Sequence, residues 1–204
     1  MSALRKLFGP SHVEVWKKVA EETGGQFSDG GFWGKKKVEV RVKEWTITLD
    51  TYTVSTGKSH ITYTRLRAPY LNQGNFRFTL YRSNFFYEFA KKLGLQDIQI
   101  GEQGFDREFI IKSDDAEKIR TLLAFPKLRE LISAQPRIHF QIKDDEGRFG
   151  SKFRPGVDEL YFQATGVIKD IERLKSLFTL FALTLNYLCQ IGSAVEGDPQ
   201  IELK

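Results

Sequence analysis

The sequence predicts an α+β protein: antiparallel sheets with helices packed on one face, in two related or fused halves. Three observations favour this fold class: a capped amphipathic helix near residue 12, a run of segments with a two-residue apolar period between residues 37 and 82, and a long apolar helix after residue 170. A helix followed by an antiparallel meander lacks the strand–helix alternation of a doubly wound parallel sheet, so that fold is excluded.

The first helix has clear start and stop signals. Ser11 and Glu14 have capping-box spacing, in which each side chain satisfies a free backbone N–H of the first turn. Val13, Trp16, Val19 and Ala20 then lie on one helical face. Gly24-Gly25 ends the helix, because glycine accepts the left-handed conformation at a helix terminus.

An antiparallel meander of about four strands follows this helix. Valines alternate with charged residues at 37–43, and the apolar parity shifts at Glu44, which predicts a bulge or tight turn there. Further strands are expected at 60–67 and 75–82, separated by glycine-containing turns. Residues 84–93 read as a helix that docks on the sheet.

The second half is expected to begin after the segment 93–104, which divides the chain into residues 1–94 and 95–204. A strand is predicted at 105–112, followed by a helix that Ser113 to Asp115 cap and that Pro126 splits. Strands at 137–143 and 158–167 come next. These two subdomains are compatible with a single fused domain.

The last helix opens at Asp170 and is apolar around most of its circumference. The surplus apolar surface requires a second packing partner, either the first helix through Trp16 or another copy of the same helix. The second option predicts a weak homodimer through the C-terminal helix. Residues 192–204 read as a frayed tail. The apolar residues concerned are Leu174, Leu177, Phe178, Leu180, Phe181, Leu183, Leu185, Leu188 and Ile191.

Composition indicates a soluble, cytoplasmic chain. Hydrophobic residues make up 41% of the 204 residues and charged residues 28%, which suits a folded core. The single cysteine, Cys189, lies in an apolar run and reads as a small buried hydrophobe. The apolar stretch 177–191 is interrupted by polar residues and is shorter than the roughly 20 residues that a membrane span needs, so no transmembrane segment is expected.

The segment from residue 105 onward resembles uncharacterised bacterial proteins of the domain-of-unknown-function 3137 kind. In that pattern an F-D-x-x-F strand precedes an S-x-D cap and a leucine-rich helix, and an upstream W-x-x-x-A…G-G-x-F is similar too. The resemblance implies membrane-spanning helices ahead of the soluble part, which this sequence lacks, and it brings no established activity. The matching residues are Trp16, Ala20, Gly24, Gly25, Phe27, Phe105, Asp106, Phe109, Ser113, Asp115, Leu122, Leu123 and Leu128.

The sequence contains no recognised catalytic or metal-binding motif. Metalloprotease, nucleophile-elbow, phosphate-loop and dinucleotide-binding signatures are absent, and no two of the three histidines have metal-ligand spacing. We therefore expect neither a cofactor nor a metal. The leading hypothesis is a non-enzymatic binding or interaction module, with an enzyme of unidentified reaction as an alternative.

A second alternative is nucleic-acid or other polyanion binding through a basic sheet face. Residues 1–100 carry 16 Lys and Arg against 9 Asp and Glu, and basic, tyrosine and threonine side chains alternate along the first strands. Such a face can meet phosphates and stack bases only if its cations are exposed together. A plain solvated or helix-covered face remains the other reading. The candidate residues are Arg41, Lys43, Arg65, Arg67, Arg77 and Tyr81.

Overall fold

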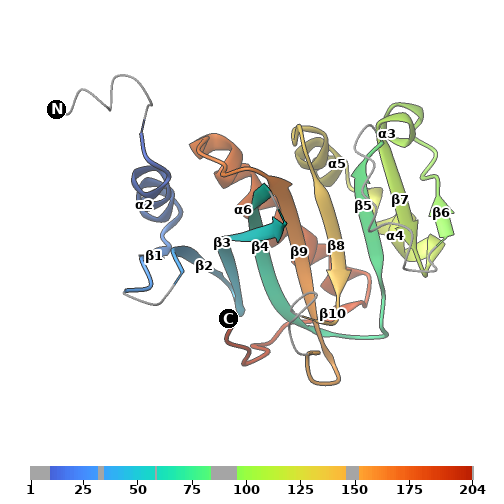
Figure 1. Cartoon of the computed structure of the whole chain (residues 1–204). Coiled ribbons are helices and arrows are strands. Elements are labelled where there is room, and N and C mark those ends of the chain that lie inside the picture. Colours follow the sequence, from blue (N-terminus) through green and yellow to red (C-terminus); the bar gives the residue numbers. More distant parts are fainter. Residues whose placement is uncertain (1–9, 32–34, 58, 84–95, 146–151, 204) are drawn as a thin grey trace.

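The computed structural model describes residues 10–31, 35–57, 59–83, 96–145 and 152–203 (Figure 1). The helices of this part of the chain are α2 (His12–Thr23), α3 (Gln103–Glu108), α4 (Ala116–Leu123), α5 (Pro126–Ser133) and α6 (Ile171–Gln190). The strands are β1 (Gln26–Ser28), β2 (Lys37–Val42), β3 (Trp45–Thr56), β4 (Ser59–Asn72), β5 (Phe78–Arg82), β6 (Gln96–Ile98), β7 (Phe109–Ser113), β8 (His139–Lys143), β9 (Val157–Thr165) and β10 (Ala194–Val195).

All these strands join one antiparallel sheet. Its order is β1-β2-β3-β4-β9-β8-β5-β7-β6, and β10 pairs with the end of β4. Strand β9, from the second half of the chain, lies between β4 and β8, whereas β5, from the first half, lies between β8 and β7. The two halves predicted by the sequence are therefore fused in one sheet, and the fold is α+β as expected.

Alternation along the strands gives this sheet two chemically different faces. One face, the apolar face, presents side chains such as Val38, Ile47, Leu66, Phe140 and Phe162, all almost fully buried. Apolar residues of α2, α4, α5 and α6 belong to the same core cluster. Figure 1 shows α5 and α6 lying along one side of the strands. The hydrophobic core thus fills the layer between sheet and helices.

Helix α6 is held on both flanks by other helices, α2 and α5. Its apolar surplus therefore has a partner within the chain. The indole N–H of Trp16 in α2 donates to the carbonyl oxygen of Ile168, just before α6, at 3.2 Å. Of the two partners that the sequence left open, the first helix occupies this surface, and this argues against α6 as the interface of a homodimer.

Two local predictions are wrong. Residues 103–108 form helix α3 rather than the start of a strand, because the Asp106 carboxylate accepts from the N–H groups of Ile100 and Gly101 and folds the chain into a turn. Phe105 then packs on Phe109 with ring centroids 4.5 Å apart, and the strand begins only at Phe109. The tail is not frayed either, because β10 pairs with β4.

Other predictions are confirmed. The Ser11–Glu14 capping box is formed, Gly24 ends α2 in the left-handed conformation, and Pro126 begins α5. The parity shift at Glu44 is a tight turn between β2 and β3. The helix expected at 84–93 lies outside the described residues.

Candidate functional site

The second face of the sheet, which we call the polar face, is built of charged and hydroxyl-bearing residues from neighbouring strands. Direct cross-strand pairing brings them into two rows. The first row is Lys37, Asp50, Arg65, Gln163, His139 and Tyr81. The second row is Glu39, Thr48, Arg67, Tyr161, Gln141, Thr79 and Lys112.

Asp50 is the centre of a buried ion network on this face. Its Oδ2 accepts from Nη2 of Arg65 at 2.9 Å and from Nη2 of Arg67 at 3.0 Å, and Arg65 Nε also binds Oδ1. Asp50 is 3% exposed and Arg67 is 1% exposed. Removal of two guanidinium groups from water is costly, and the shared carboxylate offsets part of this cost.

A second ion pair lies beside the first network. Lys143 Nζ is 2.9 Å from Oε2 of Glu159, whose side chain is fully buried. Burial raises the pKa of Glu159, although Lys143, Arg67 and Arg65 oppose that shift. Together the two groups bring three basic and two acidic side chains into one buried network.

Aromatic rings and a glutamine side chain cover this network. The Arg65 guanidinium lies over the Tyr52 ring and the Lys143 ammonium over the Tyr161 ring, at 5.1 and 4.1 Å from the centroids. Gln163 Oε1 accepts from the hydroxyls of Tyr52 and Tyr161, at 2.5 and 2.9 Å. Part of the burial is therefore mutual, since these long side chains cover one another.

The titratable side chains near the network are held in their neutral forms. Burial raises the pKa of Tyr161. Burial, with the nearby Lys143 charge, lowers the pKa of His139 to about 4. Neither group titrates near neutral pH, so neither is tuned for proton transfer there. The arrangement stabilises a rigid surface rather than an acid–base pair.

The structure does not assemble the predicted polyanion residues into one exposed basic face. The expected exposure is wrong for Arg65 and Arg67, which are buried against Asp50. Tyr81, the candidate for base stacking, is 5% exposed and meets the His139 ring edge-on. Asp50, the partner of these cations, is 15 residues from Arg65 along the chain and is brought opposite it by the pairing of β3 with β4.

The other three cations lie apart from this network. Arg41 is exposed and pairs with Glu44 at 3.4 Å. Lys43 lies in the turn after β2, where its ammonium contacts Asn186 and Glu196. Arg77 pairs with Asp158 and lies 3.9 Å from Asp144. Each is thus already neutralised by a carboxylate.

A groove runs along the polar face where residues 196–203 cross it. We call these residues the strap. The strap follows β10 and returns toward the end of the sheet formed by β2 and β3 (Figure 1). Between the strap and the sheet is a hollow of about 320 Å³, the strap groove. The sheet contributes Glu39, Thr46, Thr48 and Pro69 to its lining.

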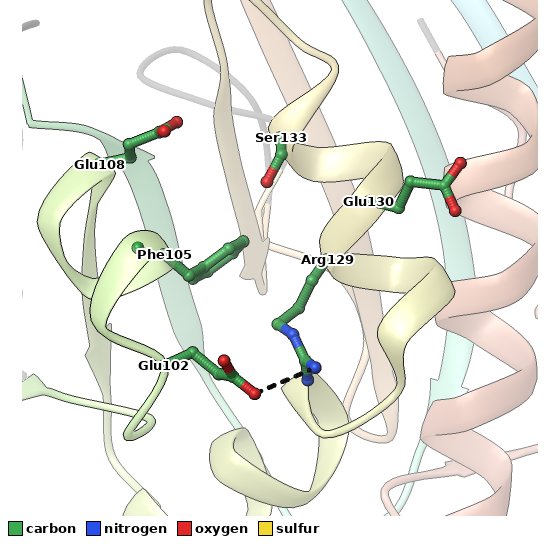
Figure 2. A pocket seen from close by; sticks show the side chains of 7 residues that line it. Glu102, Phe105, Glu108, Arg129, Glu130 and Ser133 are labelled. Carbon is green, nitrogen blue, oxygen red and sulfur yellow. Dashed lines mark hydrogen bonds and ion pairs between the residues drawn. The ribbon is translucent and has the colours of Figure 1, made fainter.

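A second hollow, of about 230 Å³, lies between α3 and α5. Figure 2 shows the Phe105 ring pointing into it and Glu102 facing Arg129, while Glu130 points away. Glu102 Oε1 and Arg129 Nη2 are 3.3 Å apart, with the Glu102 side chain 58% exposed. This hollow is smaller than most ligand pockets and is bridged by a solvent-exposed ion pair.

In the described part of the chain, no group of three or more His, Cys, Asp and Glu side chains is placed to hold a metal ion. None of the helices described is both long and apolar enough to cross a membrane.

Comparison with known proteins identifies a shared fold. No family model matches the sequence, and no curated protein matches it. The resemblance to the domain-of-unknown-function 3137 kind therefore stays a prediction. Among solved structures, the chain is similar to the crystal structure of the mycobacterial trehalose monomycolate transport factor A, TtfA. The TM-score is 0.52 and the identity 9%, over 90% of this chain and 97% of that chain. The protein thus has the same overall fold as TtfA.

Proposed function

We propose that this protein is a non-catalytic interaction module that binds a short, non-helical peptide segment in the strap groove. The observation that carries the proposal is the strap itself, which is a stretch of polypeptide seated on the polar face. The volume of about 320 Å³ is within the range of ligand pockets. The chain's own residues 196–203 then act as an internal ligand that a partner peptide replaces.

The strap is held at one end and loosely placed at the other. Glu196 pairs with Lys43 at 3.0 Å, and Nη2 of Arg154 donates to the carbonyl oxygen of Pro199 at 2.9 Å. Past Gln200, residues 201–203 have no hydrogen bond or ion pair with any other described residue. Ile201 and Leu203 are half-buried and rest in the groove through their side chains. A segment held in this way can be displaced at modest cost.

The lining of the groove suits a peptide. Thr46 and Thr48 supply hydroxyl groups, Glu39 supplies a carboxylate that Lys37 already neutralises at 2.8 Å, and Pro69 supplies an apolar surface. Such a mixture matches a segment in which apolar side chains alternate with backbone polar groups. The neighbour in fold is named a transport factor, and a binding role is in keeping with that name.

A peptide-binding experiment tests the proposal. The strap is opened in the full chain by Glu196→Lys with Ile201→Ala, which repels Lys43 and removes a half-buried side chain of the strap, while Arg154 is kept to bind the probe. The probe is a fluorescent peptide with the sequence of residues 196–203 (EGDPQIEL), and anisotropy is the readout. The matched control is Glu130→Lys with Ile110→Ala, which makes the same change of charge and the same truncation of a half-buried side chain away from the groove.

The opened variant should bind the peptide with a Kd of some hundreds of micromolar, and the control about tenfold more weakly, because an anchored strap competes at a high effective concentration. A scrambled peptide should bind neither protein. If the opened variant binds no better than the control at about 1 mM peptide, the proposal is wrong.

A further inference from the structure

The hairpin formed by β3 and β4 extends beyond the rest of the sheet. Strand β2 pairs with β3 only as far as Asp50, and β9 pairs with β4 only from Thr64 onward. From Thr51 to Thr56, β3 is therefore paired with β4 alone in the described part of the chain. On the β4 side, Gly166 covers the edge by hydrogen bonds with Thr62 and Thr64.

The backbone direction along this overhang follows from its turn. Thr56 and Ser59 flank a two-residue turn and pair with each other, and such a flanking pair is hydrogen-bonded. Successive residues of a strand direct their backbone N–H and C=O groups to opposite sides of that strand, so the backbone groups of residues 52, 54 and 56 hydrogen-bond to β4. Thr51, Thr53 and Ser55 direct their N–H and C=O groups to the outer edge, where no described backbone group pairs with them.

This edge lacks the features by which proteins block unwanted strand pairing. Residues 51–56 (TYTVST) contain no charge, no proline and no glycine. Val54, at 39% exposure, is one of two large hydrophobic side chains exposed in the described residues. The edge strands β1 and β6, at the two sides of the sheet, differ from this overhang. Each is only three residues long and has an acidic residue, Asp97 within β6 and Asp29 just after β1.

We propose that the outer edge of β3 pairs with the same edge of a second copy of this chain, antiparallel and centred on Thr53. This register matches Thr53 with Thr53, Thr51 with Ser55 and Tyr52 with Val54, and it forms about six backbone hydrogen bonds. The central threonine pair repeats one already made within the hairpin, where the hydroxyls of Thr53 and Thr62 are 3.0 Å apart. Threonine pairs and aromatic–β-branched pairs both favour such pairing.

The sequence of the strand identifies a second copy as the occupant. A segment that is uncharged and nearly symmetric about Thr53 is complementary to itself, and a two-fold contact needs this property. The tyrosine rings of the hairpin, stacked at 5.1 Å between centroids, lie on the polar face, and the dimer would place the Val54 side chain of the second copy beside Tyr52. This dimer uses a different surface from α6 and does not depend on the strap groove.

Disulfide trapping in the full chain tests the register. In a Cys189→Ser background, Thr53→Cys places two thiols on a hydrogen-bonded pair whose Cα atoms are about 5.5 Å apart, within disulfide range. Val195→Cys, at the other exposed hydrophobic position, is the matched control. Mild oxidation should convert most of the first variant to covalent dimer and leave the control monomeric.

A second variant tests the interface without a thiol. Thr53→Pro removes an N–H that points to the outer edge and so spares the ladder to β4. Sedimentation of the wild type should shift from 23.5 kDa toward twice that mass as its concentration rises. With an interface this small, the shift should come in the tens of micromolar, and the proline variant should stay monomeric.

Two results would overturn the dimer: a wild type that stays at 23.5 kDa up to about 200 µM, or trapping at Thr53→Cys no faster than at Val195→Cys. Trapping of the wild type through Cys189 would instead place α6 at the interface, and would also count against the proposal.

Discussion

The two faces of the sheet bury their side chains by different physical means. On the apolar face, Leu66 meets Leu49 and Phe162 from the neighbouring strands and is fully buried beneath the helices. On the polar face, Arg65 and Arg67 flank the same leucine in sequence. They are also buried, and both donate hydrogen bonds to the Asp50 carboxylate. Burial on the first face stabilises the fold directly, whereas burial on the second is tolerable only while the charges remain balanced.

The way in which the polar face buries its charges bears on what this face can bind. On the polar face, the buried Arg65 and Arg67 and the half-buried Lys143 pair with carboxylates of the chain itself. The two proposed binding surfaces, the strap groove and the overhanging hairpin, lie at the margins of this face. The comparison of the two faces can be tested by substitutions on adjacent residues of one strand.

The largest effect is expected from Asp50→Ala. This change leaves two buried guanidinium groups without their carboxylate and should lower the free energy of unfolding by about 3–5 kcal/mol. Leu66→Ala, on the opposite face, should cost about 2–5 kcal/mol through loss of packing. Urea denaturation of the purified variants measures both.

A compensating variant tests whether Asp50→Ala destabilises the protein through unpaired charge rather than through lost packing. Asp50→Leu with Arg65→Met and Arg67→Met removes all three charges together and should recover most of the stability lost in Asp50→Ala. A triple variant no more stable than Asp50→Ala would contradict the view that charge imbalance is what destabilises this face.

The next effect concerns pH and His139. The imidazole binds a proton near pH 6.5 in the unfolded chain but only at about 4 in the folded protein. Between these values the unfolded state holds more protons, so acidification should lower the free energy of unfolding by about 3 kcal/mol in total. His139→Gln should flatten this part of the pH profile. Tyr81→Phe, which keeps the ring beside His139, is the control and should retain the slope.

A smaller effect of opposite sign is expected at Glu159. Because burial raises its pKa, the folded protein disfavours the charged carboxylate, and Glu159→Gln should be neutral or mildly stabilising at pH 7. The gain should fade as the pH falls toward the pKa of the folded carboxyl, since the wild type then takes up the proton itself. A marked loss of stability at pH 7 would show that the pair with Lys143 dominates instead.

The smallest effect is expected at an exposed ion pair. Lys127 and Glu130 are 2.8 Å apart on the surface of α5, with side chains 54% and 67% exposed. Glu130→Gln should change the free energy of unfolding by less than about 0.5 kcal/mol, because water and salt screen such pairs. It therefore serves as the baseline for the polar-face variants, and a loss above about 1 kcal/mol would show that the baseline is misjudged.

Much of the fold was predictable from local patterns. The alternation of valines with charged residues at 37–43 indicates which face of β2 is buried, and the starts of α2 and α5 follow from the Ser11 cap and from Pro126 in the first turn. The first turn of α3 was missed although Phe105 and Phe109 have the i, i+4 spacing of a helix. The order of strands was beyond local patterns, because β9 pairs with β4 across a long separation in sequence.

The centre of the site was also missed, although a signal for it exists. A two-residue turn between Thr56 and Ser59 fixes the register of the hairpin, and in that register Asp50 lies opposite Arg65. Counting outward from the turn would have paired the carboxylate with the guanidinium. The strap groove had no such signal, since its two walls meet only through tertiary packing.

Mapping the peptide site by NMR tests the central claim most directly. The claim is that recognition takes place in the strap groove on the polar face rather than in the hollow between α3 and α5. Addition of the 196–203 peptide to the opened variant should shift the amide resonances of Glu39, Thr46 and Thr48, which line the groove, and leave those of Gly104 and Ser133 unchanged. Shifts confined to Gly104 and Ser133, or no shifts at all, would contradict the account.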